Sequence, residues 1–187
     1  MSTNLMPSEE PRQHAVFRLL LQAMCRPGCV QRLPTAPDED PLTTLLDSLF
    51  DQEVSYCLAA PDEVLDTAIR ARWNARPVAA AEADFFIAGQ GRSFGHLEQL
   101  RRGIPENPDL GATAIYRVAS FARDGETRTL TGPGIRAETR ISIHGLGPAE
   151  LTTLRRINSE FPLGLDAVFV STSGELLSIP RSTRIGD

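Results

Sequence analysis

Residues 148–179 read PAELTTLRRINSEFPLGLDAVFVSTSGELLSI, and this stretch decides the fold class. Pro148 opens a predicted helix in which three apolar residues recur at helical spacing and form one apolar face. Residues 167–171 and 175–179 are runs of β-forming residues separated by a Ser-Gly turn, which predicts a β-hairpin. A helix followed directly by a hairpin indicates that helices and strands share one core. The apolar residues of the helix are Leu151, Leu154 and Ile157.

Upstream of this stretch, expected helices and expected strands alternate along the chain. Pro11 sits in the first turn of a predicted helix that ends at Pro27, and Asp40 is an N-cap followed by a first-turn proline. This second helix is expected to reach Phe50. Residues 103–111 are rich in Pro and Gly and are predicted to be a loop. Further helices are predicted from residue 61 and across 94–102, and strands across 29–33, 54–58, 83–88, 112–121, 127–131 and 139–144.

The order of these elements predicts their packing. The turn-forming residues 123–126 are expected to join strands 112–121 and 127–131 as an antiparallel pair. Together with the C-terminal hairpin, this predicts an α/β fold with a mixed β-sheet flanked by helices. A polar leader over residues 1–10 is expected to be flexible, and residues 11–187 are expected to form a single domain.

The first predicted helix carries an apolar stripe at the spacing i, i+3, i+4, i+7, which is typical of an amphipathic helix. We expect this stripe to be the buried face of the helix. His14 lies off the stripe and is expected at the surface or in an interface. The stripe consists of Phe17, Leu20, Leu21 and Met24.

The composition argues against several classes of partner. A formal net charge of -5, with acidic residues spread along the chain, leaves no basic stripe for a nucleic acid backbone. No apolar run reaches the roughly 18 residues that cross a bilayer, and the N-terminal residues lack the features of a signal peptide. We therefore expect a cytoplasmic protein with no nucleic acid and no membrane partner. Cys25, Cys29 and Cys57 are expected to be free thiols, and no metal site is predicted.

The sequence contains no lysine, and all 19 basic residues are arginine. Pyridoxal phosphate forms its internal aldimine with a lysine amine, and a P-loop places a lysine beside the nucleotide phosphates. Neither mechanism can operate in a chain without lysine. We therefore expect that this chain binds no pyridoxal phosphate and no other cofactor of its own.

Two segments have the composition of an anion-binding site. In the first, Gly132 and Gly134 flank a proline, so that backbone amides could converge on an anion beside the Thr131 hydroxyl. A tight turn between strands needs the same residues, so both interpretations stay open. The second segment, residues 179–184, places arginines and hydroxyls after a strand, which suits a phosphate or a carboxylate of a neighbouring subunit. A solvated tail is the alternative there, and the candidate residues are Arg181, Thr183 and Arg184.

We predict no catalytic residue acting in this chain alone. The sequence contains no Gly-x-Ser-x-Gly elbow, no His-Glu-x-x-His pair and no complete Rossmann glycine motif. The glycine-rich residues 89–93 follow a predicted strand but lack the third glycine, which favours a structural turn over a phosphate loop. His96 and His144 have no carboxylate at a spacing that would orient them as bases.

Four segments of the chain resemble landmarks of PhnH, the family of H subunits of bacterial carbon-phosphorus lyase. They occur in the family's order and span nearly the whole sequence. The tail reads Arg-Ser-Thr where Arg-Thr-Thr is expected, a departure that keeps both hydroxyls. The landmarks are residues 17–28 (FRLLLQAMCRPG), 130–135 (LTGPGI), 161–166 (FPLGLD) and 179–181 (IPR).

This resemblance implies a fold like the large domain of pyridoxal-phosphate-dependent transferases, without the cofactor. It also implies a homodimer that joins the G, I and J subunits in a core complex. With the G, I and L subunits, the family supports displacement of adenine from ATP by a phosphonate, which gives ribose 1-phosphonate 5-triphosphate. ATP with Mg is then a substrate of the complex, and the later radical cleavage of the carbon-phosphorus bond belongs to the J subunit.

Two roles for this chain are compatible with the resemblance. In the first, the chain is a structural subunit whose surface docks partners while catalysis lies elsewhere. In the second, it contributes residues to a nucleotide or phosphonate site that another subunit completes. The residues of that second role are Thr131, Gly132, Gly134 and Arg181.

Overall fold

The structure is a computed structural model that describes residues 11–121 and 126–187. The predicted leader 1–10 and most of the predicted turn 123–126 lie outside the described residues. The helices are α1 (Arg12–Cys25), α2 (Pro41–Leu46), α3 (Glu63–Trp73) and α4 (Glu150–Ile157), with 3-10 helices η1 (Ala80–Glu82), η2 (His96–Gln99) and η3 (Asn158–Glu160). The strands are β1 (Gln31–Arg32), β2 (Ser55–Leu58), β3 (Arg76–Pro77), β4 (Phe85–Ala88), β5 (Arg102–Ile104), β6 (Asn107–Gly111), β7 (Thr113–Val118), β8 (Glu126–Thr131), β9 (Thr139–Ile143), β10 (Asp166–Ser171), β11 (Glu175–Ile179) and β12 (Arg184–Ile185).

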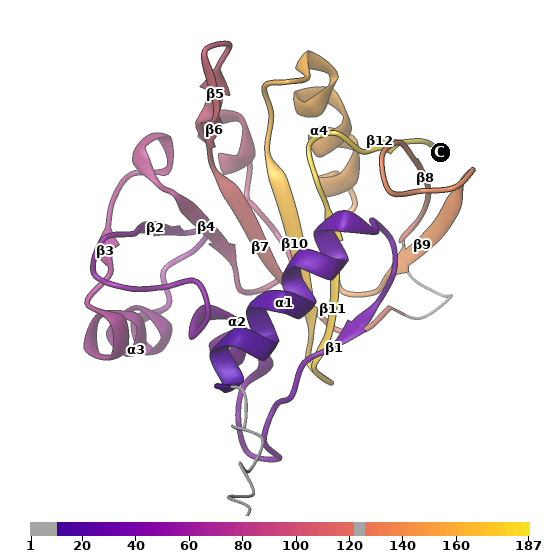
Figure 1. Ribbon diagram of the computed structural model, residues 1–187. Helices are drawn as coiled ribbons and strands as arrows, with labels where there is room; N and C mark the ends of the chain where they lie inside the picture. Colours follow the sequence, from indigo (N-terminus) through magenta and orange to yellow (C-terminus); the bar gives the residue numbers. More distant parts are fainter. Residues whose placement is uncertain (1–10, 122–125) are drawn as a thin grey trace, which may run out of the picture.

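A seven-stranded sheet organises the molecule, in the order β1-β11-β10-β7-β4-β2-β3 (Figure 1). Strands β3, β2, β4, β7 and β10 run parallel to one another, whereas β11 pairs antiparallel with both β10 and β1. The predicted C-terminal hairpin and the predicted mixed sheet flanked by helices are therefore confirmed.

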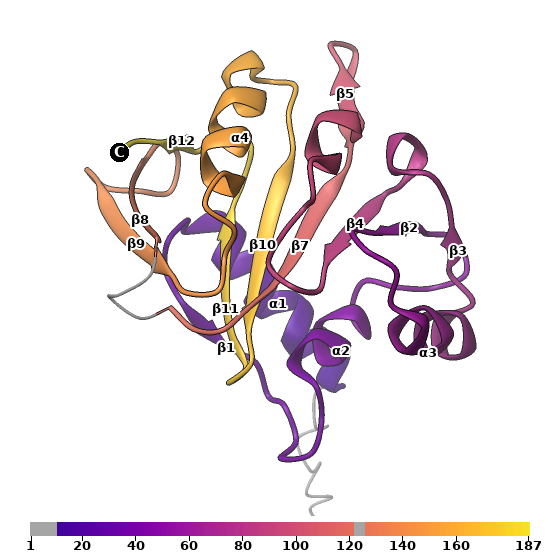
Figure 2. The ribbon, with the colours of Figure 1, turned by 180° about the vertical axis from the view of Figure 1, so that it is seen from behind.

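Helices and a smaller sheet cover the two faces of the large sheet. Along β10, Val168 and Val170 join a cluster with residues of α1, α2 and α3, whereas Ala167 and Phe169 join one with residues of α4. This alternation follows from the two-residue period of a strand. α1 crosses in front of β10 and β11 in Figure 1, and α4 lies in front in the view from behind (Figure 2). The three-stranded sheet β12-β8-β9 closes the α4 side.

The predicted pairing of residues 112–121 with residues 127–131 is wrong. β7 lies inside the large sheet between β4 and β10, whereas β8 pairs with β9 and β12 in the small sheet. β7 buries Tyr116 on one face and Ile115 on the other, which suits a central parallel strand. Turn-forming residues between two strands do not require that the two strands pair with each other.

The buried face of α1 agrees with the prediction only in part, because Leu20 is buried and Met24 is partly buried against the same cluster, whereas the other two predicted residues are exposed. The helix buries Val16, Leu20 and Ala23, while Phe17 and Leu21 are 44% and 47% exposed. Val16, Leu20 and Ala23 all belong to the cluster that α1 shares with the large sheet. His14 is exposed, as predicted.

Three boundaries differ from the predictions. Residues 103–111 belong largely to the β5–β6 hairpin. Gly103 in this hairpin has a φ of +82°, and a Cβ there would lie 2.5 Å from the Pro108 carbonyl oxygen, so the position requires glycine. The helix expected across 94–102 is only the single turn η2. α2 ends at Leu46, although its Asp40 N-cap is confirmed, since that carboxylate accepts from the Leu42 amide.

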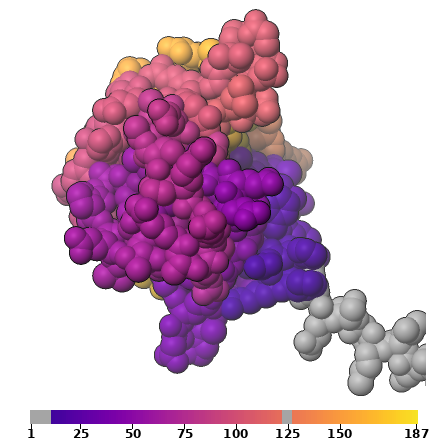
Figure 3. Space-filling view, turned by 90° about the vertical axis from the view of Figure 1, so that its left-hand side faces the viewer, coloured from indigo at the N-terminus to yellow at the C-terminus, as the bar shows by residue number. Residues whose placement is uncertain are grey.

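The ends of the molecule differ in shape. Figure 3 faces the α3 and β3 end and shows the β5–β6 hairpin projecting at the top. Within the described residues, no helix has both the length and the apolar character needed to span a bilayer.

Candidate functional site

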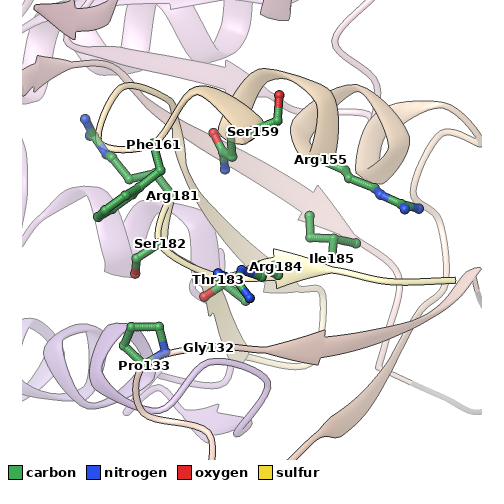
Figure 4. A pocket seen from close by; sticks show the side chains of 11 residues that line it. Gly132, Pro133, Arg155, Ser159, Phe161, Arg181, Ser182, Thr183, Arg184 and Ile185 are labelled. Atoms are coloured by element: carbon green, nitrogen blue, oxygen red, sulfur yellow. The ribbon is translucent and has the colours of Figure 1, made fainter.

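A cavity of about 690 Å³ lies between the end of α4, the loop after β8 and the segment that joins β11 to β12 (Figure 4). In Figure 4, Arg155, Ser159 and Phe161 come from the α4 side, while Gly132 and Pro133 lie opposite them. The lining residues are Gly132, Pro133, Arg155, Asn158, Ser159, Phe161, Arg181, Ser182, Thr183, Arg184 and Ile185.

Strand pairing brings the two anion-binding candidate segments of the sequence together. β12 pairs antiparallel with β8, and Arg184 lies opposite Thr131 in this register. Just beyond that pair, a Cβ on Gly132 would lie 3.1 Å from the Ser182 carbonyl oxygen, because the two chains pass so closely. Residues about fifty positions apart therefore form neighbouring walls of one cavity.

Arg181 is bound to the protein itself. Its Nη2 and Nε donate to Asp166 Oδ2 over 2.6 and 3.1 Å, its backbone amide donates to Asp166 Oδ1 over 2.8 Å, and Nη1 donates to the Pro108 carbonyl oxygen. The Arg181 side chain is only 13% exposed. Its charge is therefore already balanced, and its contacts tie the start of β10 and the β5–β6 hairpin to the segment after β11.

The other cations of the cavity are less engaged. Arg184 is exposed and has no ion-pair partner within the described ranges 11–121 and 126–187. The Arg155 guanidinium is 52% exposed and lies 2.9 Å from Asp187, whose side chain is 95% exposed. Because solvent screens such exposed pairs, Arg155 can exchange this carboxylate for another anion at little cost.

Thr183 is the most unusual polar residue of the lining. It is 3% exposed, and its Oγ1 is buried without a hydrogen-bond partner among the described residues. A buried hydroxyl without a partner is unfavourable, and such groups are rare in folded proteins. Thr183 therefore borders the cavity, but its hydroxyl oxygen is itself buried and is not exposed to the cavity.

The remaining predicted site residues do not line the cavity. Thr131 is the strand partner of Arg184 but is not part of the lining. Gly134 has a φ of +80°, and a Cβ there would lie 2.1 Å from the Cys25 carbonyl oxygen, so this glycine permits contact with the end of α1. The conformation of Gly134 therefore allows the loop to pack against α1, which agrees with the interpretation of this loop as a tight turn.

Sequence reasoning missed the contribution of α4 and η3. Four residues that line the cavity were not predicted as site residues, namely Arg155, Asn158, Ser159 and Phe161. Asn158 is buried and exchanges hydrogen bonds of 3.0 and 2.8 Å with the backbone of Leu165. The helix pattern predicted the buried face but contained no signal for which polar residue at its end would face another segment.

The glycine-rich residues 89–93 are not arranged around an external anion. The Ser93 amide donates to Glu150 Oε1 over 2.8 Å, and the Tyr116 hydroxyl donates to Glu150 Oε2 over 2.9 Å. Burial, followed by the nearby Glu150 charge, raises the pKa of Tyr116 well above its ordinary value. An internal carboxylate thus occupies the position that a phosphate would take.

A second polar cluster connects α3 to β2. The Tyr56 hydroxyl donates to Asp66 Oδ1 over 2.6 Å, and Arg70 Nε donates to Asp66 Oδ2 over 2.7 Å. Burial and the hydrogen bond to Asp66 raise the pKa of Tyr56 to about 12, and the same hydrogen bond lowers the pKa of Asp66. Nearby, burial raises the pKa of the Cys57 thiol. In the part of the chain that the structure describes, no three metal-binding side chains gather.

The chemistry of the large cavity is suited to binding an anion. Its lining combines three guanidinium groups, three hydroxyls and the apolar groups of Pro133, Phe161 and Ile185. Among the described residues that line it, none is His, Cys, Asp or Glu, so no general base stands beside the hydroxyls. The lining therefore offers positive charge and hydroxyl groups to an anionic ligand.

Comparisons with known proteins give one consistent family. A family model described as bacterial phosphonate metabolism protein (PhnH) matches residues 7–186. HtxG of Stutzerimonas stutzeri, whose name marks it as a candidate C-P lyase subunit protein, is 34% identical over 177 residues, which are 95% of this chain and 87% of HtxG. A second relative, from Rhizobium meliloti (strain 1021), is named alpha-D-ribose 1-methylphosphonate 5-triphosphate synthase subunit PhnH. It is 26% identical over 182 residues, which are 91% of this chain and 88% of the relative.

Proposed function

This chain belongs to the PhnH family of bacterial phosphonate metabolism proteins, and we propose that it works as a non-autonomous subunit of a carbon-phosphorus lyase complex in the breakdown of organic phosphonates. The observation that carries this proposal is the extent of the family match. Residues 7–186 include all three sheets of the described residues and every cavity-lining residue. The match therefore covers the features that a subunit function would use.

The proposed reaction is the one that the second relative's name describes at the level of the complex. Together with G, I and L subunits, this chain would support displacement of adenine from ATP by a phosphonate, which gives ribose 1-phosphonate 5-triphosphate. ATP with Mg would be a substrate of the complex, and the J subunit would act afterwards. Assembly as a cytoplasmic homodimer with G, I and J subunits, and a likeness to the large domain of pyridoxal-phosphate-dependent transferases, stay predictions.

The cavity favours a contributed ligand site over a purely structural role. Its lining has no base, so the chain needs partners for chemistry. At the same time, Arg184 lines the cavity without an ion-pair partner among the described residues, and protein–protein docking elsewhere on the surface would not require this. A purely scaffolding subunit remains the second candidate, which the exposed apolar residues of α1 support.

Co-expression of the tagged chain with the other lyase subunits tests the proposal. We expect the G, I and J subunits to co-purify and the purified mixture, with the L subunit, to release adenine from ATP only when a phosphonate is present. Failure of every lyase subunit to co-purify with the wild-type chain would refute membership of the complex.

A matched pair of arginine variants separates the two roles. Arg184→Ala removes a cavity cation, whereas Arg140→Ala removes an exposed arginine of β9 that does not line the cavity. If the chain contributes a ligand site, Arg184→Ala should assemble normally and lose adenine release, while Arg140→Ala should retain both. Full adenine release by the Arg184→Ala complex would favour the scaffold.

A further inference from the structure

We infer that the β5–β6 hairpin is a docking element that inserts into an apolar groove with a basic rim on a different subunit of the lyase complex. Its contact surface consists of the apolar side chains of Ile104, Pro105 and Leu110 and the carboxylates of Glu106 and Asp109. The inference rests on the proposed function, because it names the surface and the kind of partner that membership of the complex requires.

The hairpin stands at the amino edge of the large sheet. Only Ala112 separates β6 from β7, and the loop before β10 runs beside β5, because the Gly164 amide donates to the Arg102 carbonyl oxygen over 2.9 Å. β7 and β10 are parallel neighbours in which Thr113 lies opposite Asp166, so both segments enter the sheet from the same edge. Figures 1 and 3 show that the hairpin projects beyond this edge, where a partner can approach its tip.

The base of the hairpin is anchored to the body of the molecule. Arg181 Nη1 donates to the Pro108 carbonyl oxygen, and the Ala112 amide donates to the Arg101 carbonyl oxygen over 2.8 Å. Gly111 approaches Arg181 so closely that a Cβ there would lie 2.5 Å from Nη1. Because a two-stranded hairpin alone is marginally stable in water, these contacts stabilise it in one conformation. An element held in one conformation loses little conformational entropy when it docks.

Each strand of the hairpin exposes a large aliphatic side chain. Ile104, at the end of β5, is 47% exposed, and Leu110, in β6, is 48% exposed. Pro105, between the strands, is also exposed. Within the described chain, neither core cluster includes a residue of 102–111, so the hairpin has no apolar core of its own. Burial of these groups against another surface would remove their apolar area from water.

The open edges of the hairpin do not suit the addition of a partner strand. In the described chain, β5 and β6 form a sheet of two strands, so each has one edge that pairs with no other strand. Pro108 in β6 has no N–H, and its carbonyl oxygen already accepts from Arg181. Gly103 in β5 has a φ of +82°, which departs from the conformation of a regular strand. Because such features block strand pairing at an edge, the docking contacts are made by side chains.

The charges of the hairpin favour a basic partner. Glu106 and Asp109 are exposed and have no ion-pair partner among residues 11–121 and 126–187. The arginines at the base, Arg101 and Arg102, are already paired with carboxylates of the body. A symmetric contact with a second copy of the chain would bring like charges together, and contact with another face of that copy would not close into a dimer. The charges therefore favour a basic surface on a different subunit.

Photocross-linking in the co-purified complex identifies the partner. A photoreactive phenylalanine derivative replaces Ile104, and in a control chain it replaces Val64, which is 83% exposed on α3. We expect position 104 to cross-link to a different lyase subunit, at a segment rich in Lys or Arg, and position 64 to give no such product. Cross-linking of position 104 only to a second copy of this chain would overturn the inference.

Competition between differently tagged wild-type and variant chains for incorporation into the co-expressed complex measures the contribution of each side chain. Leu110→Asp places a charge in the apolar contact and should lower incorporation at least about tenfold, whereas Val64→Asp should incorporate like the wild type. Glu106→Arg should lower incorporation about fivefold, because it meets a basic rim, whereas Glu53→Arg, at another exposed carboxylate, should have no effect.

Urea unfolding of the isolated variants separates docking from folding. We expect every variant to keep the wild-type midpoint, and Glu106→Arg, which changes only an exposed charge, keeps the test valid if Leu110→Asp unfolds. Wild-type incorporation of the folded hairpin variants would refute the inference and would leave co-purification of the wild-type chain intact. Failure of the wild-type chain to co-purify would instead refute the proposed function, and the inference with it, so the two failures are distinguishable.

Discussion

At the residue scale, three polar side chains within four positions of the chain have three different environments. Arg181 is nearly buried and paired with Asp166, Thr183 is buried with an unsatisfied hydroxyl among the described residues, and Arg184 is exposed. The chain turns after β11, where the Thr183 amide donates to the Pro180 carbonyl oxygen, and Arg184 is already the first residue of β12. Similar composition therefore did not mean similar function.

The two arginines should differ sharply in their effect on stability. Arg181→Ala removes the guanidinium that donates to Asp166 Oδ2 and to the Pro108 carbonyl oxygen, and only the backbone amide of residue 181 still donates to Asp166, so we expect a loss of about 2–4 kcal/mol in the free energy of unfolding. Arg184→Ala removes an exposed side chain and should change it by no more than about 0.5 kcal/mol. Urea unfolding measures both, and equal effects would contradict the assigned roles.

At the scale of elements, the burial of a helix face was harder to predict than the helix itself. α1 begins and ends close to the predicted residues, but its buried face includes Val16 and Ala23 in place of Phe17 and Leu21. Periodicity alone allows neighbouring stripes when a helix carries many apolar residues. Contact with the sheet decides which of these stripes is buried.

Two adjacent leucines of α1 provide a matched test of this face. Leu20 is 6% exposed and Leu21 is 47% exposed. We expect Leu20→Ala to lower the free energy of unfolding by about 2–4 kcal/mol and Leu21→Ala by less than about 1 kcal/mol. Chemical denaturation of the isolated chain measures the difference. A larger loss for Leu21→Ala would mean that the originally predicted stripe is the buried one.

At the scale of the whole molecule, hydrogen-bonded carboxylates connect the acid stability of the fold to particular contacts. The Tyr56 hydroxyl lowers the pKa of Asp66, and for Asp84 hydrogen bonds from Ser55 and Arg101 outweigh the effect of burial, so that its pKa is also lowered. Both groups bind a proton less readily in the folded chain than in the unfolded chain. Stability from them is therefore present above the unfolded pKa of about 3.9 and is lost as pH falls through the folded pKa.

Acid unfolding should reveal this dependence. Asp66→Asn removes one of the two carboxylates, so stability should fall less steeply with pH below about 4 than in the wild type. Asp109→Asn, at an exposed position of the β5–β6 hairpin, serves as the control and should keep the wild-type slope. Thermal melts between about pH 2 and pH 7 provide the comparison. An Asp66→Asn slope identical to that of the wild type would show that this carboxylate does not contribute.

The sequence by itself determined the local features of this protein. Interactions within a few positions of the chain fix the Asp40 cap, the apolar runs of the central strands and the C-terminal hairpin, so these features could be predicted without a fold. The chemical consequence of having no lysine follows from the composition alone. For the same reason, the composition around Gly132 and of the terminal arginines predicts an anion site, and this stays a prediction.

Only the tertiary structure decided how distant segments meet. Packing between residues far apart in the chain places β7 inside the large sheet and pairs β8 with β9 and β12. The same kind of packing adds Arg155 and Phe161 to the cavity. The same packing paired Arg181 with Asp166 and left Arg184 open to solvent. Local patterns specify which elements form, whereas burial and pairing across the core determine which side chains share a site.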